Sequence, residues 1–191
     1  MRPSPVELRR ATPADVKDVA DVFAASCRHA YQDVLPPAQL AKYVPDVQIP
    51  RWTEHFDKLP SGHRVTAAFR QERVIGFIET RHTPHTAENT TIGGVTLGAD
   101  VGEVTYLFVD PRHIGTGVGR LLLAEGERHL TATGAETAIL WVFSDNRPAR
   151  AFYEGSGWTW TGHEQLDAGL RRQGYSVREQ LYSKALDKPM P

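Results

Sequence analysis

EVTYLFVDPRHIGTGVGRLLL, residues 103–123, joins a predicted strand, a glycine-rich turn and the start of an apolar helix. Asp110 and Pro111 end the strand, and glycines follow at positions 115, 117 and 119. Glycine lets backbone N–H groups approach an anion closely, and the first turn of a helix has N–H groups without intrahelical acceptors. The positive end of the helix dipole adds to this attraction. The stretch therefore predicts a site for a phosphate or pyrophosphate group.

The sequence on either side of this stretch alternates between strand and helix patterns. Upstream, the predicted elements are a strand at 7–10, a helix from the Thr12–Asp15 cap to about residue 30, a short helix from Pro36, a segment at 51–59, a hairpin of strands 64–70 and 73–81, and a loop at 83–100. Downstream, they are a helix ending near Gly134, a buried strand at 138–143, a short helix at 148–154 and strands at 158–166 and 175–186. This order predicts an α/β fold with a mixed sheet and helices on its faces. We expect one domain over residues 1–187 and a short tail at 188–191.

Composition indicates an ordinary soluble protein. The 191 residues carry 22 Lys and Arg against 23 Asp and Glu, a formal net charge of −1, and these charges are scattered. Neither nucleic acid nor a membrane is therefore expected as a partner. The N-terminus has no apolar signal segment, and Cys27 is the only cysteine, so we expect a cytoplasmic protein without internal disulfides. Pro84 stands between His82 and His85 and no cysteine is nearby, so no metal site is expected.

A second informative block is NRPARAFYEGSGW, residues 146–158. It places Tyr153 on a predicted short helix, seven residues after Asn146 and before a glycine turn. The two blocks, in this order and separation, resemble the GNAT superfamily of acyl-CoA-dependent N-acetyltransferases. The resemblance extends over nearly the whole chain in the order of its elements.

The resemblance implies a fold and a cofactor. The fold is a mixed, mostly antiparallel sheet that is splayed between its fourth and fifth strands, with helices on both faces. The cofactor is acetyl-CoA, used as a co-substrate, without a metal. In this family the strand before the turn pairs with the pantetheine arm, and the amides of the turn bind the pyrophosphate. The matching positions here are Leu107, Phe108, Val109, Gly115, Thr116, Gly117, Val118, Gly119 and Arg120, with Asn146 as a further ligand of the pantetheine or as a turn and cap residue.

One position departs from the family pattern. The family often has Arg or Gln where this chain has Ile114, so one side-chain contact to the cofactor is in doubt. Arg112, two residues earlier, is a candidate to compensate, although the alignment does not make it the equivalent residue.

The resemblance also implies catalytic residues. Glu103 matches the strand carboxylate that acts as general base, directly or through water, and Tyr153 matches the acid that meets the coenzyme sulfur. Glu79, on the neighbouring strand, is the alternative base. Tyr31 lies where the family's first helices frame the acceptor pocket, although packing or simple exposure is an alternative reason for it.

These features predict an N-acetyltransferase that moves the acetyl group of acetyl-CoA directly to a primary amine of a small molecule or peptide, in a ternary complex. Two alternatives remain open. One is a non-catalytic acyl-CoA-binding regulatory domain, and the other is an acyltransferase that modifies a hydroxyl or uses a longer acyl group. The family often dimerises, so a homodimer is a further option, whereas the identity of the acceptor lies beyond the motifs.

Overall fold

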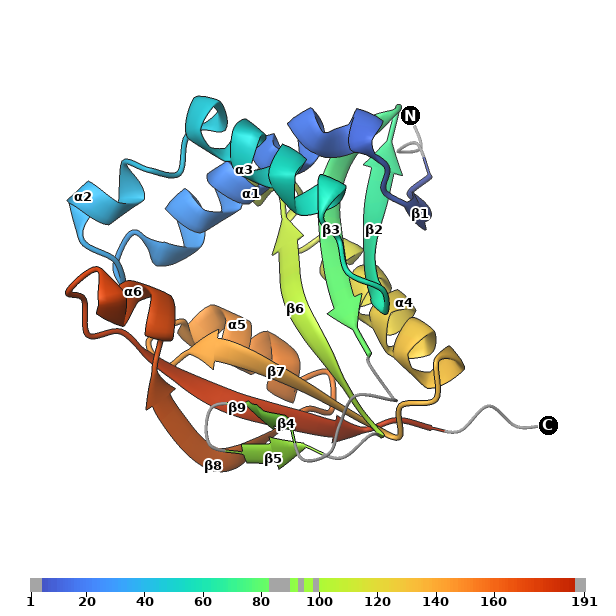
Figure 1. Ribbon diagram of the computed structural model, residues 1–191. Coiled ribbons are helices and arrows are strands. Elements are labelled where there is room, and N and C mark those ends of the chain that lie inside the picture. Colours follow the sequence, from blue (N-terminus) through green and yellow to red (C-terminus); the bar gives the residue numbers. More distant parts are fainter. Residues whose placement is uncertain (1–4, 83–89, 93–94, 98–99, 188–191) are drawn as a thin grey trace. The chain divides into compact units, whose positions relative to one another are not determined.

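The computed structural model describes residues 5–82, 90–92, 95–97 and 100–187 (Figure 1). The chain forms two compact units, each made of two segments. The first unit joins Met1–Thr80 to Tyr106–Gly126, and the second joins Arg81–Thr105 to Glu127–Pro191. Strand β6 (Val101–Val109) and helix α4 (Val118–Ala132) both continue from one unit into the other. The predicted tail at 188–191 lies outside the described residues.

The first unit contains four strands of one sheet, together with several helices. Its elements are β1 (Glu7–Arg10), the 3-10 turn η1 (Pro13–Asp15), α1 (Val16–Tyr31), α2 (Pro37–Leu40), α3 (Pro45–Asp57), β2 (His63–Arg70), β3 (Arg73–Arg81), the end of β6, η2 (Pro111–His113) and the start of α4. β1 pairs antiparallel with β2. A tight turn at Gln71 and Glu72, both with positive φ, joins β2 to β3, which confirms the predicted hairpin.

Alternation along β3 assigns its two faces to different helices. Phe77 packs edge-on against Trp52 of α3, with the ring centroids 5.1 Å apart. Gly76 and Ile78 turn the other way: a Cβ at Gly76 would lie 3.0 Å from Leu122 of α4, and Ile78 lies against Gly126. Because successive residues of a strand point to opposite faces, helices cover both sides of this strand, as predicted. Figure 1 shows α1 and α3 running side by side.

The predicted segment at 51–59 is mostly the later part of a longer helix, α3. This helix starts at Pro45, ends at Asp57 and runs through Pro50. Pro50 lacks an N–H group and interrupts one helical hydrogen bond, which is why the pattern suggested a boundary there. Tertiary contacts outweigh this cost: Trp52 is buried between Phe23 and Phe77, and the Gln48 side chain donates to the Lys42 carbonyl over 2.8 Å.

The start of α1 is held by Asp15, whose side chain closes the predicted cap. Its carboxylate accepts from the Thr12 N–H at 2.8 Å and from Arg9 at 2.8 and 2.9 Å. The hydrogen bonds from Arg9, followed by those from Thr12, lower the pKa of Asp15 to about 2. A lowered pKa contributes stability above the usual carboxyl pKa, and this contribution is lost as pH falls toward 2.

We therefore expect Asp15→Asn to lower the free energy of unfolding by about 1–2 kcal/mol at neutral pH. The difference from the parent should shrink as pH is lowered from about 4 toward 2. Urea unfolding at a series of pH values measures it. The control is Asp46→Asn, because Asp46 is an exposed acid in the first turn of α3. An equal loss at every pH would contradict the ionic origin of the effect.

The second unit contains the start of β6, the end of α4, β7 (Thr137–Phe143), α5 (Arg147–Glu154), β8 (Thr159–Leu166), α6 (Ala168–Arg172) and β9 (Arg178–Ala185). β6 and β7 are parallel, with a register that runs from Val101 opposite Thr137 to Val104 opposite Leu140. β7 pairs antiparallel with β9, and β9 with β8. The short helix α6 was not predicted. It lies between the two predicted strands at 158–166 and 175–186 and has only five residues.

The predicted loop at 83–100 is partly wrong. Two short strands, β4 (Thr90–Ile92) and β5 (Val95–Leu97), pair antiparallel within it. Strands of three residues are too short to show the alternation on which the prediction depended. His85, one of the two histidines at which no metal site was expected, lies outside the described residues.

The predicted fold class is confirmed. A seven-stranded mixed sheet has the order β1-β2-β3-β6-β7-β9-β8, and β4 and β5 form a separate pair. The parallel pair β6 and β7 is therefore the fourth and fifth strand of this sheet counted from β1. Crossing from β6 to a parallel neighbour requires a connecting helix, which α4 supplies.

Candidate functional site

The glycine turn lies in the first unit, between η2 and α4. Gly115 and Gly117 have φ of +79° and +89°, and a Cβ at either position would meet nothing within 4 Å. Thr116 donates its hydroxyl to the His113 carbonyl at 2.7 Å, and Val118, buried, begins α4. The turn is thus held by its own contacts while its glycines border open space. Such a turn can receive an anion against its backbone amides and the helix N-terminus.

The end of β6 leads into this turn. Phe108 packs against Phe23 and Phe77, with ring centroids 5.0 and 5.8 Å away, so this segment is anchored to the core of the unit. The Val109 carbonyl accepts a hydrogen bond from the buried Ser26 hydroxyl at 2.8 Å. Leu107 is half-buried in the same segment.

Ile114 and Arg112 bear on the departure from the family pattern. Ile114 is 55% exposed, so it contributes an apolar surface where the family often has a polar side chain. Arg112 donates to Asp110 through Nε at 3.0 Å and through a terminal nitrogen at 2.6 Å. These hydrogen bonds hold the pKa of Asp110 below its usual value. Arg112 therefore braces η2, and Arg120, exposed in the first turn of α4, is the other cation beside the glycines.

Glu103 lies in the second unit, on the part of β6 that pairs with β7. Its Oε2 accepts from Nε of Arg81 at 2.7 Å and also from a terminal guanidinium nitrogen. The Glu103 side chain is 12% exposed and that of Arg81 is 37% exposed. The carboxylate is thus oriented by a cation that reaches solvent.

Asn146 and Tyr153 bracket α5 in the second unit. The Asn146 side chain accepts from the Ala149 N–H at 3.3 Å and so caps the helix, as one of its predicted roles required. Tyr153 is buried, with Phe152 and Trp158 as ring neighbours. Burial raises the pKa of the Tyr153 hydroxyl well above its usual value. The hydroxyl therefore stays protonated and can act as a proton donor.

Glu79, predicted as the alternative base, is buried on β3. Its side chain is 1% exposed, and its two oxygens contact His55 Nε2 at 2.7 Å and His63 Nδ1 at 2.9 Å. Both oxygens of this carboxylate are thus paired with imidazole nitrogens. Tyr31, half-buried, ends α1, where its carbonyl accepts from Val34 and Leu35.

The sequence analysis did not single out His55 and His63. His55 belongs to the part of the chain where the helix boundary was misplaced, and His63 begins β2 one residue before the predicted strand. They meet Glu79 only through tertiary packing, so no spacing along the chain could indicate the cluster.

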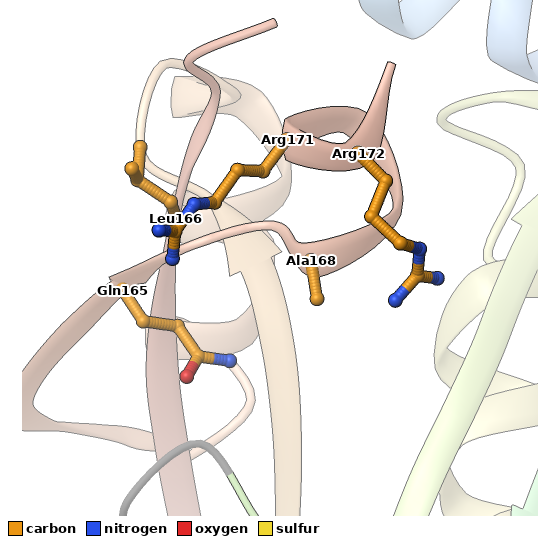
Figure 2. A pocket seen from close by; sticks show the side chains of 5 residues that line it. All are labelled: Gln165, Leu166, Ala168, Arg171 and Arg172. Carbon is orange, nitrogen blue, oxygen red and sulfur yellow. The ribbon is translucent and has the colours of Figure 1, made fainter. Parts of the chain in front are cut away.

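A pocket of about 570 Å³ lies at the hairpin formed by β8, α6 and β9 (Figure 2). Its lining residues are Gln165, Leu166, Ala168, Arg171 and Arg172. The two arginine side chains project from α6 in different directions (Figure 2). None of the predicted site residues lines this pocket, so the chemistry of the glycine turn and of the carboxylates identifies the candidate site instead.

The described residues show neither a metal cluster nor a membrane-spanning helix. Among them, no group of three or more His, Cys, Asp or Glu side chains is placed to hold a metal ion. No helix in the described ranges is long and apolar enough to cross a membrane.

Solved structures identify the fold. The PaiA N-acetyltransferase from Thermoplasma acidophilum, solved with coenzyme A, aligns with a TM-score of 0.67 and 18% identity over 95% of this chain and 99% of that one. A GCN5-related N-acetyltransferase from Rhodopseudomonas palustris aligns with a TM-score of 0.69 and 21% identity over 97% and 99% of the two chains. The fold is thus that of N-acetyltransferases.

Sequence comparison identifies the family. The model of the acetyltransferase (GNAT) family matches residues 25–158. This chain therefore belongs to the GNAT acetyltransferase family, which confirms the resemblance seen in the sequence.

Curated relatives are named mycothiol acetyltransferases. That of a Nocardioides species is 35% identical over 78% of this chain and 48% of its own length. That of Thermobifida fusca is 35% identical over 63% of this chain and 35% of its own length. The chain thus spans about half the length of these relatives or less.

Proposed function

We propose that the chain transfers the acetyl group of acetyl-CoA directly to a primary amine of a small molecule or peptide, in a ternary complex. The observation that carries this proposal is the glycine turn, whose positive-φ glycines border open space at the start of α4. Backbone amides in this arrangement suit a pyrophosphate. Gly115, Thr116, Gly117, Val118, Gly119 and Arg120 would bind that group, and Leu107, Phe108 and Val109 would pair with the pantetheine arm.

The remaining steps need a proton acceptor and a proton donor. Glu103, oriented by Arg81, would take a proton from the reacting nitrogen, directly or through water. A backbone N–H near Leu107 would stabilise the oxyanion. Tyr153, whose hydroxyl carries its proton at neutral pH, would donate to the departing thiolate, and Asn146 would support the pantetheine while it caps α5. Direct transfer needs no acyl-enzyme.

Cofactor binding followed by a turnover assay tests this function. Acetyl-CoA affinity is measured first by calorimetry, and thiol release is then followed with a panel of amines, peptides and compounds related to mycothiol. Amine-dependent thiol release with formation of the amide supports the proposal. Tight binding without turnover on any acceptor favours a regulatory domain. Mass spectrometry with longer acyl-CoAs and with alcohols separates the remaining alternative.

Glu103→Gln tests the carboxylate. We expect kcat to fall by about two orders of magnitude, with a small change in acetyl-CoA affinity, because the variant keeps the shape of the side chain but not its basicity. The loss should shrink as pH rises, since hydroxide can replace the missing base. Steady-state rates over a pH series measure it. A loss that is the same at every pH would mean that Glu103 only positions its neighbours.

A further inference from the structure

A cluster of His55, Glu79 and His63 in the first unit has no task in the proposed function. Glu79 lies on β3, His55 on α3 and His63 on β2, so three separate elements supply it. Glu79 is fully buried, and each of its oxygens contacts one ring nitrogen, at 2.7 Å for His55 and 2.9 Å for His63. A buried carboxylate is costly unless it is paired, and two imidazoles satisfy it here.

The contacts determine which ring nitrogens carry hydrogen. An ionised carboxylate can only accept hydrogen bonds, so each nitrogen facing Glu79 is a donor. In a neutral ring the opposite nitrogen then has a lone pair, which is Nδ1 in His55 and Nε2 in His63. The His55 side chain is 31% exposed and that of His63 is 14% exposed. His55 is therefore the member that can present a basic nitrogen to a substrate.

Aromatic side chains surround His55. Its ring centroid lies 5.2 Å from that of Trp52 and 6.3 Å from that of Tyr106. Tyr106 is 38% exposed and directly precedes Leu107, the segment to which we assign the reacting end of the pantetheine. A half-buried imidazole beside an aromatic surface suits an amine carried on an apolar body, because such a body can pack on the rings.

A primary ammonium must lose two protons before it becomes an amide. The first leaves before attack, because the protonated nitrogen has no lone pair, and the second leaves the tetrahedral adduct. Glu103 is proposed for one of these protons. A second acceptor is then required, or Glu103 must release the first proton to water between the two steps.

We propose that His55 takes the first proton, with Glu79 as the positioning residue; this inference rests on the proposed acetyl transfer. His55 Nδ1 accepts a proton from the ammonium, and the neutral amine attacks the thioester carbonyl. The C–N bond forms, the adduct loses its second proton to the base of the proposed function, the C–S bond breaks, and the acid of that function protonates the thiolate. The proton on Glu103 restores the Tyr153 hydroxyl through water, and the imidazolium returns its own to solvent. The overall products are the amide, free coenzyme A and one proton.

Glu79 gives His55 its orientation and a counter-charge for the imidazolium. The titratable groups in the described contacts around the ring are Glu79 on β3 and Tyr106 on β6, with His63 on β2 across the carboxylate. The Glu54–Lys58 pair on α3 is exposed. His55 would thus act as a base whose ring is oriented by a neighbouring carboxylate, Glu79.

His55→Gln isolates the basic nitrogen. The Gln amide can still donate to Glu79, so the buried carboxylate keeps a partner, but it offers no base. With an acceptor amine that is protonated at the assay pH, we expect kcat/KM to fall by roughly two orders of magnitude. With an amine whose pKa lies below the assay pH, the variant should match the parent, because no first proton has to be removed. Glu103→Gln should remain impaired with both amines.

The outcomes separate this inference from the proposed function. If the parent acetylates no amine, the proposed function fails. If the parent is active and His55→Gln is either unimpaired with both amines or equally impaired with both, the role of His55 as a base is wrong. Glu54→Gln, an exposed change on the same helix, is the control and should match the parent. Thermal melting confirms that each variant folds.

Glu79→Gln provides a second readout. The amide of the variant can still contact the His55 ring but supplies no negative charge, so kcat with the protonated amine should fall while KM and the rate with the unprotonated amine stay near the parent. An unchanged kcat with the protonated amine in a folded, active variant would overturn the positioning role.

Discussion

Gly117→Ala should weaken acetyl-CoA binding by about tenfold or more, equivalent to at least about 1.4 kcal/mol. Gly117 has φ of +89° and borders open space, so the added methyl has room in the free protein. The space that it takes is the one proposed for the pyrophosphate, and the positive φ is unfavourable for alanine. The N–H groups of the turn would then meet the anion at a longer distance or in a worse direction. Calorimetry with acetyl-CoA and with free coenzyme A measures the change.

A matched variant separates binding from backbone strain. Gly162, in β8, has φ of +86° and likewise has nothing within 4 Å of an added Cβ. Gly162→Ala therefore introduces a similar strain without touching the turn. Both variants should lose a similar amount of stability, about 1–2 kcal/mol, whereas only Gly117→Ala should lose affinity. Equal affinities in the two variants would exclude the turn as the pyrophosphate site.

Tyr153→Phe should lower kcat by about two orders of magnitude while acetyl-CoA affinity stays nearly the same. The substitution removes only the hydroxyl, and the ring keeps its contacts with Phe152 and Trp158. Burial raises the pKa of this hydroxyl, so the lost group is a protonated donor over the whole working range of pH. Single-turnover and steady-state measurements report the loss.

The leaving group provides the specific test of the acid. A thioester of a more acidic thiol needs less help to depart, so the defect of Tyr153→Phe should shrink with such a donor. Tyr175→Phe, in the segment between α6 and β9, is the control and should behave as the parent. A kcat that is unchanged in Tyr153→Phe would remove the acid role, and a defect independent of the thiol would point to positioning.

Much of the fold could be predicted because its signals are local. The strand–glycine–helix stretch at the end of β6 was recognised from consecutive residues, and β1 and β3 have the predicted bounds. The errors arose where local signals compete with packing. Pro50 suggested a boundary that the burial of Trp52 overrides, and the pair β4 and β5 is too short to have a period.

The residues of the candidate site likewise fall into those that the sequence suggested and those that only the packing revealed. By itself, the sequence predicted the anion-binding glycine turn from consecutive residues, and the family resemblance of its two blocks added Glu103, Asn146 and Tyr153 as candidate site residues. Only the tertiary structure decided that Glu79 is enclosed and that His55 is the group beside it with access to solvent. Those three side chains come from a helix and two strands, and their contacts depend on how these elements pack. Packing, unlike spacing, is a property of the folded chain, and only packing shows that the Glu79 carboxylate is paired with two imidazoles.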